Sequence, residues 1–244
     1  MNQPARQFEC LLALGLVFAG AISARAEYII DDFRAPANTV VRVITFVHPD
    51  RSVVETPDAG ILGGERDVLL DVIGTPGLTS FIGEIGDGSF VFGGASPGTA
   101  ATIQYDGVDA DPADALANAS GLGPVDLTVH GDRFSLDFLS LDGGGSQFTE
   151  IWMTVYSGGA SDLLVDLIPD NAGPSTYTSP PFADWVATAD PANVTALEFS
   201  MNPIGINDVD FELDTIRIVP EPSTLALCVL GLACTLACVW RRRK

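Results

Sequence analysis

Residues 133–139 read RFSLDFL, and every second residue of this stretch is apolar. Phe134, Leu136 and Phe138 alternate with a serine and an aspartate. Because successive side chains of a strand point to opposite faces, this period of two predicts a strand with one face on a core and the other in water. Residues 148–156 repeat the pattern, so we expect the stretch to be one strand of a series.

Similar short apolar runs follow one another through most of the chain, separated by turns rich in Gly, Pro, Asn and Asp. The other predicted strands are 28–33, 40–47, 68–73, 89–92, 101–108, 125–129, 163–168, 194–201 and 209–218. No long helical pattern interrupts them. The series predicts an all-β fold, an antiparallel two-sheet sandwich, and among sandwiches it favours a jelly roll.

The last predicted strand, 209–218, changes the parity of its apolar residues. They occupy odd positions as far as Leu213 and even positions from Ile216 onward. A β-bulge near Asp214 would return both sets to the core, because a bulge adds one residue to a strand and restores the inward direction.

Two short segments resemble the strands of a known family. The pattern apolar-x-apolar-Asp-x-Ile-x-Ile around Asp214 is similar to the closing strand of carbohydrate-binding jelly rolls, and residues 30–33, IDDF, resemble their first strand. The resemblance implies that the first and last strands belong to one jelly-roll domain.

The chain ends in a tripartite tail at 219–244. Pro220, Glu221 and Pro222 precede an apolar run at 225–240, and the run is followed by Arg241, Arg242, Arg243 and Lys244. With the two residues before it, the run would span about 27 Å as a helix, close to the thickness of a bilayer core. Because a basic flank stays cytoplasmic, everything before the tail is predicted to lie outside.

This order of elements resembles the PEP-CTERM sorting signal of Gram-negative bacteria. The resemblance implies that an exosortase recognises Pro220, Glu221 and Pro222 and cleaves near them. The body would then leave an inner-membrane intermediate for the cell surface or the extracellular matrix. If the mature protein kept its basic end, the body would instead be a membrane-anchored domain.

The N-terminus is typical of a signal peptide. Arg6 lies in a polar segment, 11–22 is apolar, and Ala24 and Ala26 are the small residues that a signal peptidase requires. We therefore expect three parts: a signal peptide at 1–26, a β-sandwich domain at 27–218 and the sorting tail at 219–244.

The body between these segments is strongly acidic and contains no lysine. Residues 27–219 contain six arginines and 30 acidic residues, a formal net charge of −24. This charge repels nucleic acid and anionic lipid, and we predict neither as a partner. All four cysteines lie in the targeting segments, so the body has neither a disulfide nor a cysteine-based metal site.

Two enzymatic motifs fail on inspection of their residues. Residues 94–98 match G-x-S-x-G, but Pro97 has no backbone N–H to offer an oxyanion hole. Glu150 resembles the first acid on the catalytic strand of sandwich-fold glucanases, yet Thr154 occupies the position of the second acid. A glycoside hydrolase or lyase therefore remains only the alternative, because other acids such as Glu198 cannot be paired from sequence.

A glycan-binding surface is the other hypothesis for the strand at 148–156. If its alternate apolar residues face the core, Glu150, Trp152 and Tyr156 share the opposite face, where aromatic rings stack on sugars. The competing interpretation is that a loop or second layer covers Trp152. Trp185 we expect to be an anchor at an edge or in a loop.

Calcium is the only cofactor that the sequence suggests. Hard carboxylate oxygens crowd one loop, at Asp106, Asp109, Asp111 and Asp114, and Ca²⁺ prefers such ligands. A second candidate joins Asp31 or Asp32 to Asp214, provided that the first and last strands are neighbours. Together these features predict an exported, non-catalytic sandwich of the surface or matrix, either structural or binding polysaccharide.

Overall fold

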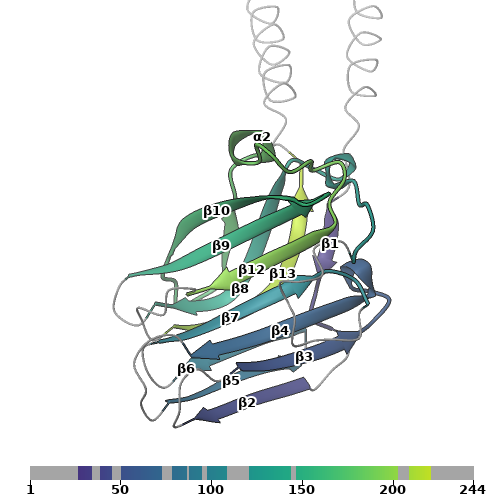
Figure 1. Ribbon diagram of the computed structural model, residues 1–244. Coiled ribbons are helices and arrows are strands. Elements are labelled where there is room, and N and C mark those ends of the chain that lie inside the picture. The colour runs from purple at the N-terminus through teal and green to yellow at the C-terminus, as the bar shows by residue number, and fades with distance from the viewer. Residues whose placement is uncertain are drawn as a thin grey trace, which may run out of the picture. The chain divides into compact units, whose positions relative to one another are not determined.

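Residues 27–219 form two antiparallel sheets that pack face to face in the computed structural model (Figure 1). The structure describes residues 27–34, 39–45, 51–72, 79–86, 88–94, 98–108, 121–143, 147–202 and 209–220, and for β2, β3 and residues 72, 79–82 and 94 it describes the backbone alone. The predicted signal peptide and nearly all of the sorting tail lie outside these ranges. Within them, no helix has the length and apolar character needed to cross a membrane.

The two sheets comprise thirteen strands within the described residues. The seven-stranded sheet has the order β11 (Ser175–Thr178), β8 (Arg133–Asp142), β13 (Asp210–Val219), β6 (Ser89–Gly94), β5 (Thr79–Gly86) and β2 (Thr39–Thr45), with β1 (Tyr28–Asp31) also paired to β13. The six-stranded sheet has the order β10 (Ala160–Pro169), β9 (Phe148–Ser157), β12 (Ala196–Met201), β7 (Thr99–Tyr105), β4 (Glu65–Val72) and β3 (Arg51–Pro57). In the described part of the chain, three short helical turns lie between strands: η1 (Leu62–Gly64), η2 (Leu127–Val129) and α2 (Phe182–Trp185).

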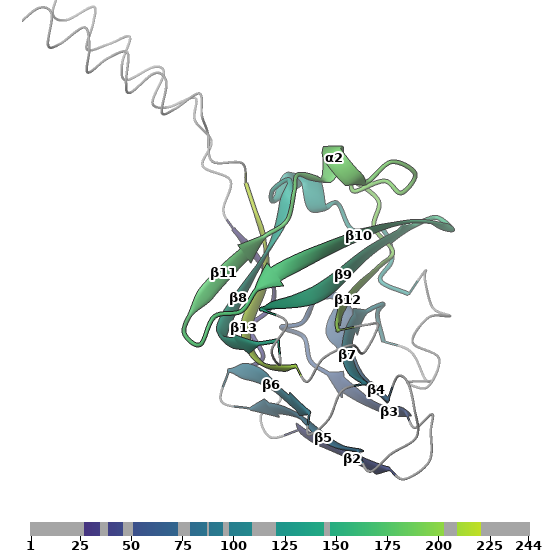
Figure 2. The same cartoon turned by 90° about the vertical axis from the view of Figure 1, so that its left-hand side faces the viewer.

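The last eight strands have jelly-roll connectivity. Between β6 and β13 the chain alternates between two four-stranded sets. One set has the order β11-β8-β13-β6, and the facing set has the order β10-β9-β12-β7. The earlier strands extend both sets on one side, where β5 pairs with β6 and β4 pairs with β7. Figure 2 shows β10 and β11 at the opposite side of the sandwich. The predicted all-β sandwich and its jelly-roll topology are confirmed.

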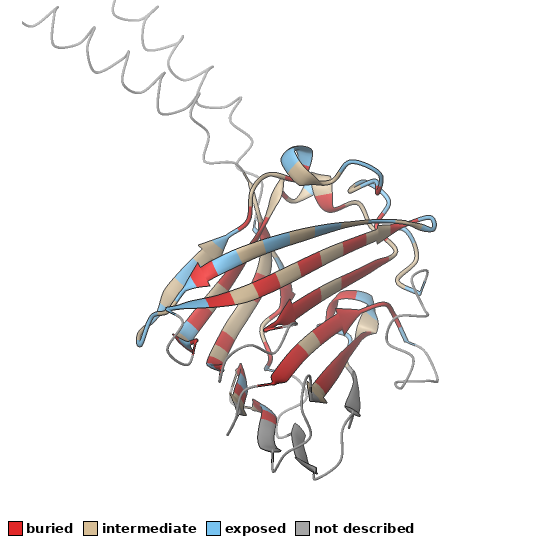
Figure 3. Ribbon diagram, turned by 60° about the vertical axis from the view of Figure 1, so that its left-hand side comes forward, coloured by how far each residue is buried: buried red, intermediate tan, exposed pale blue. Residues whose placement is uncertain are grey.

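Aromatic side chains from both sheets fill the space between them. Phe134 on β8 makes edge-to-face contacts with Phe199 on β12, at 5.2 Å between ring centroids, and with Phe182 on α2, at 5.0 Å. Each buried phenylalanine contributes about 1.5–3 kcal/mol to folding. Figure 3 shows the resulting alternation of buried and less buried residues along the central strands. The inward face predicted for residues 133–139 is therefore observed.

The parity change in the last strand is a true irregularity of β13. Its register against β8 shifts twice, between Glu212 and Leu213 and between Leu213 and Thr215. Leu213 and Ile216 are consequently both buried, as are the apolar residues before and after them. The bulge expected near Asp214 is confirmed, and it is what keeps the whole strand amphipathic with one inward face.

Four segments differ from the sequence-based prediction. β3, β5 and β11 were not expected, because β3 and β11 are largely polar and β5 contains two glycines that weaken its pattern. Residues 125–129 are not a strand. Only Val125 forms a bridge, with Val194, and the chain then turns into η2 because Asp126 accepts a hydrogen bond from the backbone N–H of Thr128 at 2.9 Å.

Candidate functional site

The outer face of the six-stranded sheet presents the three residues predicted to share a surface. Along β9, Ile151, Met153 and Val155 are buried, whereas Glu150, Trp152 and Tyr156 are only partly buried on the other side. The alternation follows from the pleat of the strand. The structure therefore places the three predicted side chains on one face, and Trp152 is partly buried there.

Strands β10 and β12 flank this row on either side. In the register, Trp152 lies opposite Val165 on β10 and opposite Ser200 on β12. Val165 belongs to an apolar stripe on the edge strand, in which Leu163, Val165 and Leu167 are 46%, 52% and 55% exposed. Sequence reasoning missed this stripe because 163–168 was judged only as a strand. Its odd-numbered apolar residues were the available signal.

Polar contacts fix the side chains on this face. The indole Nε1–H of Trp152 donates a hydrogen bond to the carboxylate of Glu150, which holds the ring in one orientation. The hydroxyl of Ser200 lies 2.8 Å from that of Thr102 on β7 and donates to Glu198 at 3.4 Å. An aromatic ring thus lies between apolar side chains on one flank and hydroxyl and carboxylate groups on the other.

The phenol of Tyr156 remains protonated over the whole physiological range. Its pKa is raised to about 12, first by partial burial and second by the negative charge of Glu198, while a hydrogen bond with Thr154 acts in the lowering direction. A neutral phenol can donate a hydrogen bond as well as accept one. The face therefore offers donors and acceptors but no titration near neutral pH from this tyrosine.

Among the strands whose side chains the structure describes, the outer face is closed beyond β12. Beyond β12, Gln104 on β7 and the β4 residues Asp67 and Leu69 occupy the same face, yet each is at least 95% buried. A long polymer could therefore contact β9, β10 and Glu198 of β12, but neither Ser200, which is 4% exposed, nor the acid on β4.

The acids on this face are widely spaced. Glu198 pairs with Thr154, four residues from Glu150 along β9, so the two acids lie about 14 Å apart along the strand direction. Glycoside hydrolysis needs two carboxyls about 5–10 Å apart across the scissile bond. The open part of this face does not bring these two acids into that range.

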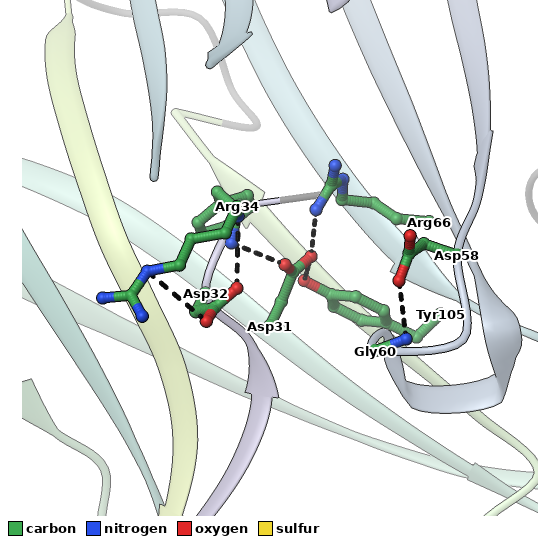
Figure 4. A network of polar contacts seen from close by, with 8 residues as sticks. Asp31, Asp32, Arg34, Asp58, Gly60, Arg66 and Tyr105 are labelled. Carbon is green, nitrogen blue, oxygen red and sulfur yellow. Dashed lines mark hydrogen bonds and ion pairs between the residues drawn. The ribbon is translucent and has the colours of Figure 1, made fainter. Parts of the chain in front are cut away.

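The second calcium candidate lies where the sheets meet. β1 does pair with β13, as that hypothesis required. The carboxylate of Asp31, however, already accepts hydrogen bonds from the guanidinium of Arg66 at 2.5 Å, from the hydroxyl of Tyr105 at 2.9 Å and from the backbone N–H of Phe33 at 2.8 Å (Figure 4). Burial raises the pKa of Asp31, while the Arg66 charge and these hydrogen bonds lower it.

The remaining acids of the calcium hypotheses are dispersed or outside the described ranges. Asp32 accepts a hydrogen bond from the backbone N–H of Arg34 at 3.1 Å, and Asp214 accepts one from the hydroxyl of Thr215 at 3.0 Å. Asp106 is buried, whereas Asp109, Asp111 and Asp114 are not described. In the described ranges no three His, Cys, Asp or Glu side chains are grouped as metal ligands, so calcium binding stays a prediction.

Trp185 behaves as the expected anchor. It belongs to α2, donates its Nε1–H to the carbonyl of Pro180 at 3.3 Å, and packs against Phe182 and Phe134. Its ring therefore stabilises the end of the sandwich and is not part of the outer face of β9.

The comparisons with known proteins separate the tail from the body. Residues 219–244 match the family model described as the PEP-CTERM protein-sorting motif, which confirms the expected sorting signal. No curated protein has a matching sequence.

Solved structures similar to the body include carbohydrate-binding modules and parts of longer enzymes, among them an α-L-arabinofuranosidase and an exo-β-agarase. A family 11 carbohydrate-binding module of the cellulosomal cellulase Lic26A-Cel5E of Clostridium thermocellum is 13% identical, with 81% of this chain and 96% of that chain covered and a TM-score of 0.37. The family 11 module from the same organism in complex with a β-1,3-1,4-mixed-linked tetrasaccharide is also 13% identical, with 81% and 98% covered and a TM-score of 0.38. These likenesses are too distant to transfer a ligand or an activity to this chain.

Proposed function

We propose that the body is a non-catalytic domain that binds polysaccharide through the outer face of β9, β10 and β12. The observation that carries the proposal is Trp152, a partly exposed aromatic ring held by Glu150 on the outer sheet face beside the exposed stripe of β10. Sugars offer an apolar C–H face and hydroxyl groups at its edge, and this surface supplies an aromatic ring with carboxylate and hydroxyl partners around it. The wide spacing of Glu150 and Glu198 supports binding without hydrolysis.

The charge of the surface favours an uncharged polymer. The sequences of β9, β10 and β12 contain no arginine, lysine or histidine, and the whole body has a formal net charge of −24. An anionic polysaccharide would be repelled, and these three strands offer no cation to pair with it.

The tail supports a location at the cell surface or in the extracellular matrix. A signal peptidase would remove residues 1–26 during export, and the PEP-CTERM motif would then direct the membrane intermediate to an exosortase. A polysaccharide-binding body fits this route, because exported chains meet the polymers of the envelope and the matrix.

The test is glycan binding by the body, residues 27–219, which contains its own core. We expect binding on an array of neutral polysaccharides, confirmed by affinity electrophoresis. Trp152→Ala should weaken it by about tenfold or more, because a stacked ring is lost, whereas Trp152→Phe should keep part of the affinity. Leu139→Ala is the matched control, since Leu139 is exposed on β8 of the other sheet.

Two outcomes would change the proposal. If the folded body binds no glycan, a purely structural role at the surface replaces it. If Trp152→Ala and Leu139→Ala both leave binding unchanged, a ligand binds elsewhere on the body.

A further inference from the structure

The body of the protein extends without a linker to the residue before the sorting motif. β13 ends at Val219, and Pro220 is the next residue. Near its end β13 is paired on both sides, because Ile218 lies opposite Phe134 on β8 and opposite Tyr28 on β1. The final residues of the body therefore belong to an interior strand of the sheet.

The backbone of Val219 is enclosed as well as paired. Its carbonyl accepts a hydrogen bond from the N–H of Asp132 at 3.2 Å. Gly131 lies so close that a Cβ on it would be 2.3 Å from the same oxygen, which leaves room for glycine alone. The last carbonyl of the body is thus held against the turn that precedes β8.

An ion-pair network ties the same segment to both neighbouring strands. Arg217 pairs with Glu27, the first residue after the predicted signal-peptidase site, at 2.6 Å, and with Asp137 on β8 at 2.6 Å. Withdrawing residues 217–219 from the sheet would break these contacts together with the strand pairing and expose the buried Ile218. Opening of this kind is cooperative and rare compared with the fraying of a free chain end.

A processing peptidase needs accessible, extended backbone on both sides of the bond that it cuts, because the reacting atoms must reach attack geometry. While the body is folded, the backbone up to Val219 is not accessible to a peptidase in this way. We propose that the folded body sets the N-terminal limit of processing, so that the cut falls C-terminal to Pro220 and the rate depends on how far the motif stands from β13. The inference rests on the proposed sorting by an exosortase.

The reaction is the cleavage of one amide bond. The C–N bond after Pro220 or a later tail residue breaks, and the carbonyl carbon gains the oxygen of water in hydrolysis or the nitrogen of an amine acceptor in transfer. The leaving nitrogen takes a proton and becomes the amino terminus of the released tail. In either case the mature protein keeps Val219 paired with Arg133.

The experiment compares three full-length chains in a Gram-negative host that processes PEP-CTERM tails. One is wild type, one carries Gly-Ser-Gly-Ser inserted between Val219 and Pro220, and one lacks Val219, which moves Pro220 to the enclosed position. The mature C-terminus is identified by intact mass, and the processing rate by pulse-chase. The matched control carries the same four-residue insert between Gly158 and Gly159, an exposed turn with open space around both glycines.

We expect a mature C-terminus at Pro220 or beyond, and rates in the order insertion, wild type, deletion, with at least about threefold between the extremes. The control should match wild type. A product that ends at Val219 or earlier overturns the proposal, and so do equal rates for the three chains. If no chain is processed although all are exported, the proposed sorting itself fails, and the inference fails with it.

Discussion

The guanidinium of Arg66 and the carboxylate of Asp31 form an ion pair inside the sandwich, with both side chains at most 1% exposed. Arg66 lies on β4 of one sheet, Asp31 ends β1 of the other, and the guanidinium also lies 5.1 Å from the centroid of the Phe33 ring. The pair therefore adds a charged contact between the two sheets to the apolar packing of the core.

Removing one partner of this pair should be costly. We expect Asp31→Asn or Arg66→Met to lower the free energy of unfolding by about 3–5 kcal/mol, because each removes the opposite charge from a buried ion pair. The double variant should lose less free energy of unfolding than the two single variants lose in sum. Urea unfolding of all three proteins and wild type measures this, and additive losses would show that the two side chains do not act as a pair.

Stability should fall in acid through Asp162 on β10. Burial raises the pKa of this carboxyl, but hydrogen bonds from the backbone N–H groups of Ala189, Thr188 and Ala187 and from the Thr188 hydroxyl outweigh burial and lower it below 3.8. A lowered pKa in the folded state stabilises the protein above the unfolded value, and this contribution is lost as the pH falls below about 4.

Asp162→Asn should therefore lower the free energy of unfolding by about 1 kcal/mol at pH 7 and by less at pH 3. Urea unfolding at several pH values checks this. The matched control is Asp184→Asn, in the exposed first turn of α2, which should leave the pH dependence of wild type intact. An Asp162→Asn variant that follows the wild-type pH curve would contradict the assignment.

A methyl group at position 131 should destabilise the body. Gly131→Ala places a Cβ against the carbonyl of Val219, so we expect a loss of about 1–3 kcal/mol and a lower Tm. Gly173→Ala is the comparison, because no heavy atom lies within 4 Å of a Cβ at that glycine. Equal melting temperatures for the two variants would mean that the turn before β8 adjusts freely.

The pKa of the Tyr156 phenol depends on the charge of Glu198 on the neighbouring strand β12. Burial is the first cause of its raised pKa and the Glu198 charge is the second, so Glu198→Gln should lower that pKa from about 12. NMR titration of ¹³C-labelled tyrosine follows the resonance of Tyr156 separately from the other three. A pKa unchanged by the substitution would place Glu198 farther from the phenol than their shared face implies.

The strands could be predicted from the sequence where the alternation of apolar and polar residues was strong. The alternation of Phe134, Leu136 and Phe138 identified β8, and the parity change beyond Leu213 located a bulge that the register of β13 confirms. The strands β3, β5 and β11 were not predicted, because polar or glycine-containing strands take their conformation from their partners more than from their own residues.

Pairing between distant segments explains what else was missed. An arginine at position 66 suggests an exposed residue, and only the fold brings it to Asp31, 35 positions away. The face of β9 was predictable because one strand supplies Glu150, Trp152 and Tyr156. Its neighbours on β10 and β12, and the burial of Asp67 and Gln104, depend on strand order and could not follow from local pattern.

The pairing of Tyr28 with Ile218 makes this body a domain whose two ends meet. A few residues joining Val219 to Glu27 would close the chain into a ring, and new ends could be opened at the exposed Gly158–Gly159 turn. For the same reason the body is suited to insertion into a surface loop of another protein, since it would enter and leave its host at a single point.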